Sequence, residues 1–313
     1  MKPYAFGVDI GGTTVKLGLF AADGKLLETW EIVTRTESDG AYILDDIAGA
    51  VKHKMGEKCL SAGDVEGIGL GVPGPVGPDG TVFKCVNLGW DVFNVERCMS
   101  ERTGLKVKAG NDANVAALGE MWQGGGRGCR DIVMVTLGTG VGGGVIMGGR
   151  ILAGVNGAAG EIGHIPMYDD DPECCGCGKR GCLEQYASAN GIVRVTKRYL
   201  AAHPEADTGL AGMGNLTARD IFGAAKAGDE VAVLMVEETG RLLGKALASI
   251  ACVVNPEAFV IGGGMANAGE MLIDAVVKNY RHYAFHAARE TRFELARLGN
   301  LAGIYGSVKM VLE

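Results

Sequence analysis

The spacing of apolar residues in the first third of the chain predicts strands joined by tight turns. Apolar residues run together or alternate over 4–10, 15–20 and 25–32, and the turn AADG separates the last two segments. Strands joined so closely pair in an antiparallel way. Residues 41–60 then have helical periodicity, and a buried strand follows at 65–72 before the Pro/Gly-rich turn GVPGPVGPDG.

The rest of the chain combines further strands with a mainly helical second half. A short strand at 105–112 precedes a helix at 113–122, and a strand-rich unit begins at 131–138. A strand-like segment follows much later, at 258–265. A domain boundary is expected near 115–125. Helical periodicity is found at 183–202, 218–228, 230–254 and 269–286.

Composition indicates a soluble globular protein. The 313 residues suffice for two domains, and the 52 glycines show no period, which is typical of many tight turns and close backbone approaches. Net charge is −7 with no lysine or arginine cluster, so we expect no nucleic-acid or membrane partner. The N-terminus has no apolar leader pattern, and no window approaches about 18 uninterrupted apolar residues, which predicts a cytoplasmic protein.

Four of the nine cysteines lie together, whereas the others are scattered. In a chain of this size without a leader, such clustering favours a metal site over a disulfide framework. The clustered residues are Cys174, Cys175, Cys177 and Cys182.

The glycine-rich loop VTLGTGVGGGVIMGG has the spacing Gly138-x-Gly140-x-x-Gly143 that is usually taken for a dinucleotide fingerprint. A Rossmann site needs strand, loop and then helix, because the helix N-terminus receives the pyrophosphate. Here β-branched residues around Gly148 and Gly149 follow, which predicts a hairpin instead. The sequence therefore argues against NAD and leaves a purely structural hairpin open.

A second loop of the same kind strengthens a phosphate-binding interpretation. GVDIGGTTVKLGLF is again strand, turn and strand, and two such hairpins could face each other with backbone N–H groups and threonine hydroxyls around phosphate oxygens. Asp9 would suit a Mg²⁺ held mostly through water. Neither loop has the GxxxxGK[ST] form of a P-loop. The candidate phosphate residues are Asp9, Gly11, Gly12, Thr13, Thr14 and Lys16 in one loop and Gly138, Thr139 and Gly140 in the other.

Seven motifs occur in the order found in the ROK family of sugar kinases and repressors, and the chain most closely resembles its bacterial glucokinases. They are DIGGTTVK, GVPGPV, NDANVAALGE, LGTGVGGG, EIGH, CGCGKRGCLEQYAS and IGGGMA, and they span nearly the whole chain. The resemblance implies an α/β, actin-like (ribonuclease H-type) ATPase fold with two domains around an ATP and sugar cleft, usually as a homodimer. We expect a small domain of residues 1–118 plus 300–313 and a larger one of residues 119–299 that carries the metal site.

The resemblance also implies roles in the sugar site of an ATP-dependent kinase. Asp112 would be the general base that accepts the hydroxyl proton, and Asn111 would hold a sugar hydroxyl. From the residues alone, Asn-Asp before a helix is an N-cap. Gly74 in GVPGP resembles the sugar-side turn, which without the family pattern is simply a turn.

The remaining sugar contacts and the adenosine side are implied in the same way. Glu161 and His164 of EIGH and Glu184 of CLEQY resemble sugar-binding residues, and the alternative is a pair of surface carboxylates beside a turn histidine. Gly262, Gly263 and Gly264 resemble the turn under the adenine or ribose; the alternative is an ordinary strand-to-helix turn.

One nitrogen and three sulfurs in a compact segment suit tetrahedral Zn²⁺. The predicted ligands are His164, Cys175, Cys177 and Cys182. Four protein ligands leave no open position, so the zinc is expected to be structural and to orient the second ring nitrogen of His164 toward the sugar. Cys174 is interpreted as a bystander.

The predicted reaction is phosphorylation of glucose by MgATP to glucose 6-phosphate, as in glycolysis. Fructose, mannose, allose or an N-acetylated amino sugar such as N-acetylmannosamine stays open as the acceptor, because pocket shape decides between such sugars. Polyphosphate or ADP stays open as the donor. A sugar-responsive repressor is the alternative from another class; we do not expect it, because the first hairpin begins within a dozen residues and leaves no room for a helix-turn-helix.

Overall fold

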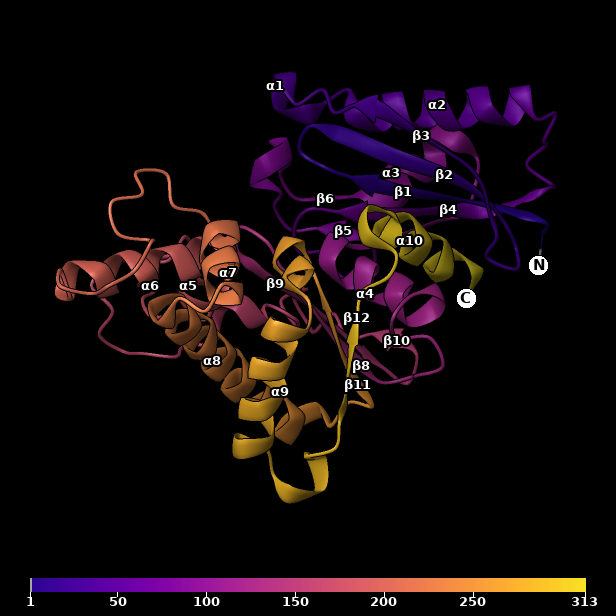
Figure 1. Cartoon of the computed structure of the whole chain (residues 1–313). Helices are drawn as coiled ribbons and strands as arrows, with labels where there is room; N and C mark the ends of the chain where they lie inside the picture. Colours follow the sequence, from indigo (N-terminus) through magenta and orange to yellow (C-terminus); the bar gives the residue numbers. More distant parts are fainter. Residues whose placement is uncertain (1) are drawn as a thin grey trace. The chain divides into compact units, whose positions relative to one another are not determined.

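The structure is a computed structural model that describes residues 2–313 (Figure 1). Its strands are β1 (Tyr4–Ile10), β2 (Thr14–Ala21), β3 (Leu26–Val33), β4 (Val65–Val72), β5 (Thr81–Val82), β6 (Phe93–Asn94), β7 (Val107–Asn111), β8 (Ile132–Leu137), β9 (Val141–Met147), β10 (Arg150–Ile151), β11 (Ala258–Gly262) and β12 (Arg292–Leu295). Its α-helices are α1 (Glu37–Gly40), α2 (Ile43–Glu57), α3 (Val95–Thr103), α4 (Asp112–Gln123), α5 (Glu184–Ala187), α6 (Ala189–Ala202), α7 (Ala218–Lys226), α8 (Glu230–Val254), α9 (Glu270–Tyr283) and α10 (Ala302–Leu312). Short 3₁₀ turns include η2 (Ile162–His164) and η3 (Gly264–Ala268).

The chain divides into two compact units. Unit 1 comprises residues up to 132, 144–160 and 297–313, and unit 2 comprises 133–143 and 161–296. This division lies away from the expected bounds at 118/119 and 299/300. The reason is that α4 continues to Gln123 and packs along α10, which keeps the segment after 118 in unit 1.

Unit 1 is built on a five-stranded sheet in the order β3-β2-β1-β4-β7. β1, β2 and β3 form the predicted antiparallel meander, while β1, β4 and β7 run parallel. Helices α2 and α3 pack on one face, where Ile68 and Leu70 of β4 lie fully buried. α10 and α4 lie beside each other in Figure 1, and α10 packs on the sheet through β1 and β4.

Glycines on alternate strand positions explain how closely α10 approaches this sheet. A Cβ on Gly7 of β1 would lie 2.2 Å from the carbonyl oxygen of Ile304, and one on Gly69 of β4 would lie 1.8 Å from that of Ser307. Side chains alternate between the two faces of a strand, so in the GIGLGV segment the apolar side chains lie on the face that packs against α2. The glycines lie on the other face, where α10 contacts the backbone directly.

Unit 2 contains most of a second five-stranded sheet, with the order β10-β9-β8-β11-β12, and the division between the units runs through β9. The strand predicted at 258–265 is confirmed as β11 but ends at Gly262, because η3 begins at Gly264, and the predicted helices are confirmed as α7, α8 and α9. α8 and α9 pack along each other. The single helix expected over 183–202 is wrong, because Ser188 has extended backbone and its hydroxyl accepts from the N–H of Gly191, so α5 ends and α6 begins there.

Both glycine loops are hairpin turns, as predicted. β1 and β2 pair across the first loop, with Asp9 opposite Lys16, and β8 continues directly into β9 across the second. β9 and β10 then pair around Gly148 and Gly149, whose φ angles are 61° and 80°. Two successive positive φ angles are the requirement of a type I′ turn, which glycine meets without strain. Across residues 2–313, no helix has the length and apolar character needed to cross a membrane.

Candidate functional site

The carboxyl ends of the parallel strands of unit 1 gather several of the predicted residues. Asp9 lies near the end of β1, Gly74 follows β4, and Asn111 ends β7 directly before Asp112 begins α4. Ligands of open α/β sheets bind outside this edge. Asn111 connects the set, because its amide nitrogen donates to the Gly74 carbonyl at 3.2 Å and to Asp112 Oδ1 at 3.0 Å.

The N-cap interpretation of Asn111 is confirmed and does not compete with a substrate role for Asp112. Asn111 Oδ1 accepts from the N–H of Asn114 at 3.1 Å, which is an N-cap contact of α4. Asp112 Oδ1 accepts from the N–H of Ala113 at 2.8 Å. The helix N-terminus therefore holds this carboxylate in a fixed orientation at the sheet edge.

The carboxylate of Asp9 is mostly buried at this edge. Burial, together with the nearby charge of Asp112, raises the pKa of Asp9 to about 6, although Lys16 opposes the shift. A carboxylate whose pKa is raised by a neighbouring carboxylate marks a place where a divalent cation would be stabilised. A Cβ on Gly303 of α10 would lie 2.5 Å from Asp9 Cγ, so the helix backbone covers the carboxylate closely.

The first hairpin is held by its own backbone and by a neighbouring threonine. The N–H of Gly11 donates to the carbonyl of Thr14 at 3.0 Å, and the Thr34 hydroxyl donates to the Gly11 carbonyl at 2.7 Å. Within residues 2–313, an added Cβ on Gly12 would meet no heavy atom within 4 Å apart from those of Gly12 and its two chain neighbours. Lys16 reaches the carbonyl oxygen of Asn300 at 3.1 Å, which ties its ammonium to the segment before α10.

The second hairpin borders a cavity of about 570 Å³ within unit 2, here called the α7 cavity. Gly138 and Thr139 lie on one side, and Gly264 of η3 lines it as well. Gly262 and Gly263 do not line it. A Cβ on Gly262 would meet that of Ala296 at 2.9 Å, and Gly263 has φ 84° beside the backbone of Leu137. Close packing therefore explains why residue 262 is a glycine, and the positive φ angle together with close packing explains why residue 263 is one. The other lining residues are Ala189, Thr217, Ala218, Arg219, Phe222, Gly223, Lys226, Met265, Asn267 and Ala268.

The sequence predicted helix α7 but not its part in this cavity, to which α7 contributes more lining residues than any other element. α7 begins at a capping box in which Thr217 and Asp220 exchange side-chain and backbone hydrogen bonds. Its buried side includes Phe222, and Arg219 and Lys226 supply two cations. The segment shows only helical periodicity, and no motif marks it as part of a binding site.

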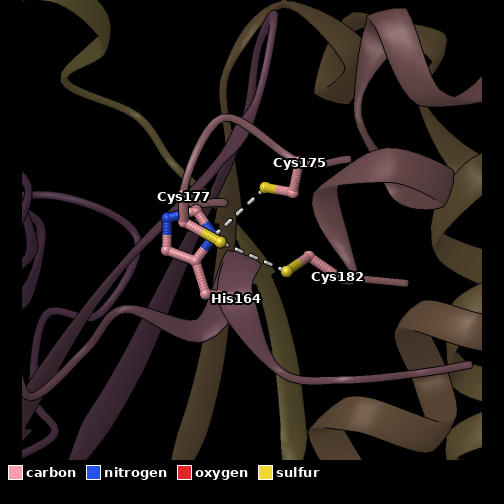
Figure 2. Close-up of side chains that lie close together, drawn as sticks. All are labelled: His164, Cys175, Cys177 and Cys182. Carbon is pink, nitrogen blue, oxygen red and sulfur yellow. Dashed lines mark hydrogen bonds between the residues drawn. The ribbon is translucent and has the colours of Figure 1, made fainter. Parts of the chain in front are cut away.

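The four predicted metal ligands converge within unit 2 (Figure 2). Their ligand atoms all lie within 4.8 Å of one another, with Cys177 Sγ and Cys182 Sγ 3.6 Å apart and Cys175 Sγ 3.6 Å from His164 Nδ1. Ligands of a tetrahedral zinc at bond lengths of about 2.0–2.3 Å are separated by roughly 3.5–3.8 Å. The donor set and its spacing therefore fit Zn²⁺.

Tight turns shape the segment from Asp171 to Cys182, here called the Cys loop. The N–H of Cys175 donates to the carbonyl of Lys179 at 2.7 Å, and Gly178 turns the chain with φ 85°. A Cβ on Gly181 would lie 1.7 Å from the carbonyl oxygen of Tyr168, so only glycine fits there. This turn brings two cysteines of CGC and the later Cys182 to one point.

Burial and hydrogen bonding give the three thiols different pKa values. Burial raises the pKa of Cys175 to about 12 and also raises that of Cys182. The pKa of Cys177 is lowered, chiefly because the N–H of Lys179 hydrogen-bonds to its sulfur. Metal binding to such a set must release protons and therefore strengthens with rising pH.

Glu184 joins the second hairpin to the Cys loop. Its Oε1 lies 2.8 Å from Cys175 Sγ and 3.8 Å from His164 Nδ1. A Cβ on Gly140 would lie 2.6 Å from its Oε2, so the glycine makes room for the carboxylate. The other ring nitrogen of His164, Nε2, lies 3.9 Å from Glu161 Oε2, and Glu161 is exposed. The three predicted sugar residues of unit 2 are thus neighbours.

A larger cavity of about 690 Å³ lies between β3 and α2 and contains none of the predicted residues. Its charged groups neutralise one another: Arg35 donates to both oxygens of Asp46, and Lys54 binds Glu57 at 2.7 Å. The volume of a cavity alone therefore does not identify the candidate functional site. A cavity of about 480 Å³ borders Thr139, Gly140, Glu184 and the Cys loop.

Comparisons with known proteins agree with the sequence motifs over the full chain. The profile of the ROK family matches residues 5–313. A glucokinase of Halalkalibacterium halodurans is 43% identical over 98% of this chain and 94% of its own length. An N-acetyl-D-glucosamine kinase of Yersinia enterocolitica is 31% identical, over 98% of this chain and 99% of its own length.

Solved structures identify the fold. A ROK family glucokinase from Streptomyces griseus, in complex with glucose and AMPPNP, has a TM-score of 0.74 and 36% identity and covers 98% of both chains. The predicted actin-like ATPase fold is therefore confirmed.

Proposed function

Because the chain belongs to the ROK family, we propose that it is an ATP-dependent glucose kinase, which converts glucose and MgATP into glucose 6-phosphate and ADP. The observation that carries this proposal is the 43% identity to a glucokinase over nearly the whole chain. The geometry supports it through Asp112, an oriented carboxylate at the sheet edge, and through the glycine hairpins of both units.

The proposed chemistry at Asp112 is a proton transfer. Its carboxylate accepts the proton of the sugar 6-hydroxyl while the hydroxyl oxygen bonds to the γ-phosphorus and the bond to ADP breaks. The N–H of Ala113 and the amide of Asn111 donate to Asp112 Oδ1 and orient the carboxylate. Asn111 also donates to the Gly74 carbonyl and so fixes the turn proposed to border the sugar.

The proposed nucleotide contacts are the two hairpins and the α7 cavity. The α7 cavity combines Phe222, which offers an apolar surface to a base, with the cations Arg219 and Lys226. The backbone N–H of Thr139 would face phosphate oxygens, whereas that of Gly138 donates to the carbonyl of Gly140 at 3.0 Å within the turn. Asp9 would hold Mg²⁺, mostly through water, and the metal would supply charge neutralisation at the phosphates.

Glu161, His164 and Glu184 are the proposed sugar contacts of unit 2. Carboxylates accept hydrogen bonds from sugar hydroxyls, and a polar lining disfavours sugars that leave its groups unpaired. Zinc on the Cys₃His set would occupy Nδ1 of His164, the nitrogen beside Cys175, and would leave Nε2 for a hydroxyl. Because four protein ligands would fill its coordination positions, the zinc would be structural.

The experiment that tests the base replaces Asp112 by Asn, with the exposed Asp91→Asn as control. The variant keeps the size and the N-cap of α4 but cannot accept the proton, so kcat should fall about 10²–10⁴-fold while glucose binding by calorimetry stays near that of the parent. Near-normal turnover in the Asp112 variant would contradict the assigned role.

A second candidate acceptor is an N-acetylated hexosamine, because the kinase from Yersinia enterocolitica carries that name. ADP release measured with glucose, mannose, fructose, allose, N-acetylglucosamine and N-acetylmannosamine decides between them. A cytoplasmic location and a homodimer stay predictions that accompany this function. Sedimentation would check the oligomeric state.

A further inference from the structure

One carboxylate outside the proposed substrate contacts is almost fully enclosed by cationic donors. The Asp171 side chain is 2% exposed, and both of its oxygens accept from both Arg194 and Arg198 at 3.0–3.2 Å. Its Oδ2 also accepts from the Tyr186 hydroxyl, and its Oδ1 from the N–H of Glu173. The arginines lie one turn apart on α6, so they point from the same helix face.

The charges of this cluster balance. Glu173 binds Arg198 at 2.5 Å and lies 3.5 Å from Arg194, so two guanidinium groups meet two carboxylates. The hydrogen bonds from Arg198 hold the pKa of Asp171 well below its usual range. A buried carboxylate that is fully paired in this way keeps its surroundings in one geometry, because any displacement would leave charges unpaired.

Two of the groups bound to Asp171, Tyr186 and Arg194, contact or belong to the residues that directly follow Glu184. Tyr186, bound to Asp171, lies two residues after Glu184 on the single turn α5. Arg194 Nε donates to the carbonyl of Gln185 at 3.0 Å, and the Arg194 guanidinium stacks 5.1 Å from the centre of the Tyr186 ring. α5 has only four residues, so it cannot fix its own orientation and depends on these contacts.

We propose that Asp171 and Tyr186 are positioning residues for Glu184, which hold α5 against α6 and thereby set the affinity for the sugar. This inference rests on the proposed function, in which Glu184 contacts the sugar. Neither residue touches Glu184 through its own side chain in the described hydrogen bonds; both act through the backbone of α5. Loss of the link lets the carboxylate of Glu184 drift from the sugar hydroxyls.

Tyr186→Phe tests the inference with the smallest change. The ring, which packs 5.0 Å from that of Tyr168, is retained, and only the hydroxyl bound to Asp171 is lost. We expect the KM for glucose to rise about three- to tenfold, because one hydrogen bond to a charged group restrains α5. The KM for ATP should stay within about twofold of the parent, since the α7 cavity has no residue in this link.

Tyr280→Phe is the matched control. Tyr280 is also buried in unit 2, and its hydroxyl donates to the carbonyl of Ala288 at 2.6 Å, far in sequence from Glu184. Tyr280→Phe should lose about as much thermal stability as Tyr186→Phe, but its KM for glucose should not change. A loss common to both variants would therefore report folding and not positioning.

Glu184→Gln separates the inference from the proposed function. If this variant and Tyr186→Phe both raise the KM and the calorimetric Kd for glucose, the inference is supported. If Glu184→Gln raises them and Tyr186→Phe does not, or if Tyr186→Phe raises the KM for ATP equally, the positioning role is refuted while the function stands. If Glu184→Gln leaves glucose binding unchanged, the sugar role of Glu184 is refuted and the inference falls with it.

Discussion

Gly140 offers a direct way to move one carboxylate by a known amount. A Cβ at this position would lie 2.6 Å from Glu184 Oε2, whereas ordinary contacts begin at 3.4 Å. The Gly140→Ala variant must therefore displace this oxygen by about 0.8 Å. Gly140 does not have a positive φ, so alanine fits the backbone, and the displaced atom is the end of a flexible side chain.

The expected effect lies in activity and not in stability. A catalytic geometry that shifts by about 1 Å can lose about 10²-fold in rate, so kcat/KM for glucose should fall about 10- to 100-fold. The free energy of unfolding should change by less than about 0.5 kcal/mol, because a side-chain rotation relieves the contact without opening a cavity.

Gly142→Ala, two residues further along the chain in β9, is the matched control. Its Cβ would lie 2.5 Å from Thr136 Oγ1, a contact of the same severity with a side chain that has no proposed substrate role. The assay is coupled glucose 6-phosphate formation at varied glucose and fixed saturating MgATP, with thermal unfolding measured on the same samples. Equal losses of kcat/KM in both variants, or none in the Gly140 variant, would refute the reasoning that Gly140 is there to admit Glu184.

Three further predictions address the metal, the fold and pH. Cys182→Ala should reduce zinc content from about one per chain to near zero by metal analysis, whereas Cys174→Ser should keep it. Glu120→Gln should lower the free energy of unfolding by about 1–3 kcal/mol in denaturant titrations. Both oxygens of the fully buried Glu120 carboxylate accept hydrogen bonds from backbone N–H groups, including that of Arg297, whereas the amide nitrogen of glutamine cannot accept one. The pKa of Asp171 is lowered in the folded state, so its contribution to stability is present above about pH 4 and is lost as the pH falls toward the folded pKa. In Asp171→Asn the free energy of unfolding should therefore depend less on pH between about pH 4 and 2. An unchanged pH dependence in this range would contradict the prediction.

Local patterns predicted most of the elements and both hairpins. The run AADG and the pair Gly148-Gly149 each demand a turn because glycine alone accepts the positive φ angles there without strain. The Cys-x-Cys spacing and His164 predicted one ligand cluster, and the four residues do converge. In these cases the physical cause lies within a few residues, so the sequence contains it.

The contacts that hold the candidate site in place span large sequence separations and were not predicted. Glu120 accepts from the N–H of Leu298, 178 residues away, and Asp171 binds Arg198 across 27 residues. The α7 cavity joins Thr139 to a helix that begins nearly eighty residues later. A carboxylate or an arginine has the same appearance in a sequence whether it faces solvent or a buried partner, so composition cannot reveal these links.

The glycines of α10 bring the C-terminal segment against two candidate parts of the site, although no motif marks this segment. Gly303 lies against the carboxylate of Asp9, and a Cβ on Gly306 would lie 1.7 Å from the carbonyl oxygen of Val115 on α4. One helix therefore contacts both a candidate Mg²⁺ residue and the helix that begins at Asp112. Because both contacts require bare backbone, the close packing of α10 fixes Asp9 and α4 relative to each other within unit 1, which is the geometric condition for a base and a metal residue to act on the same substrate.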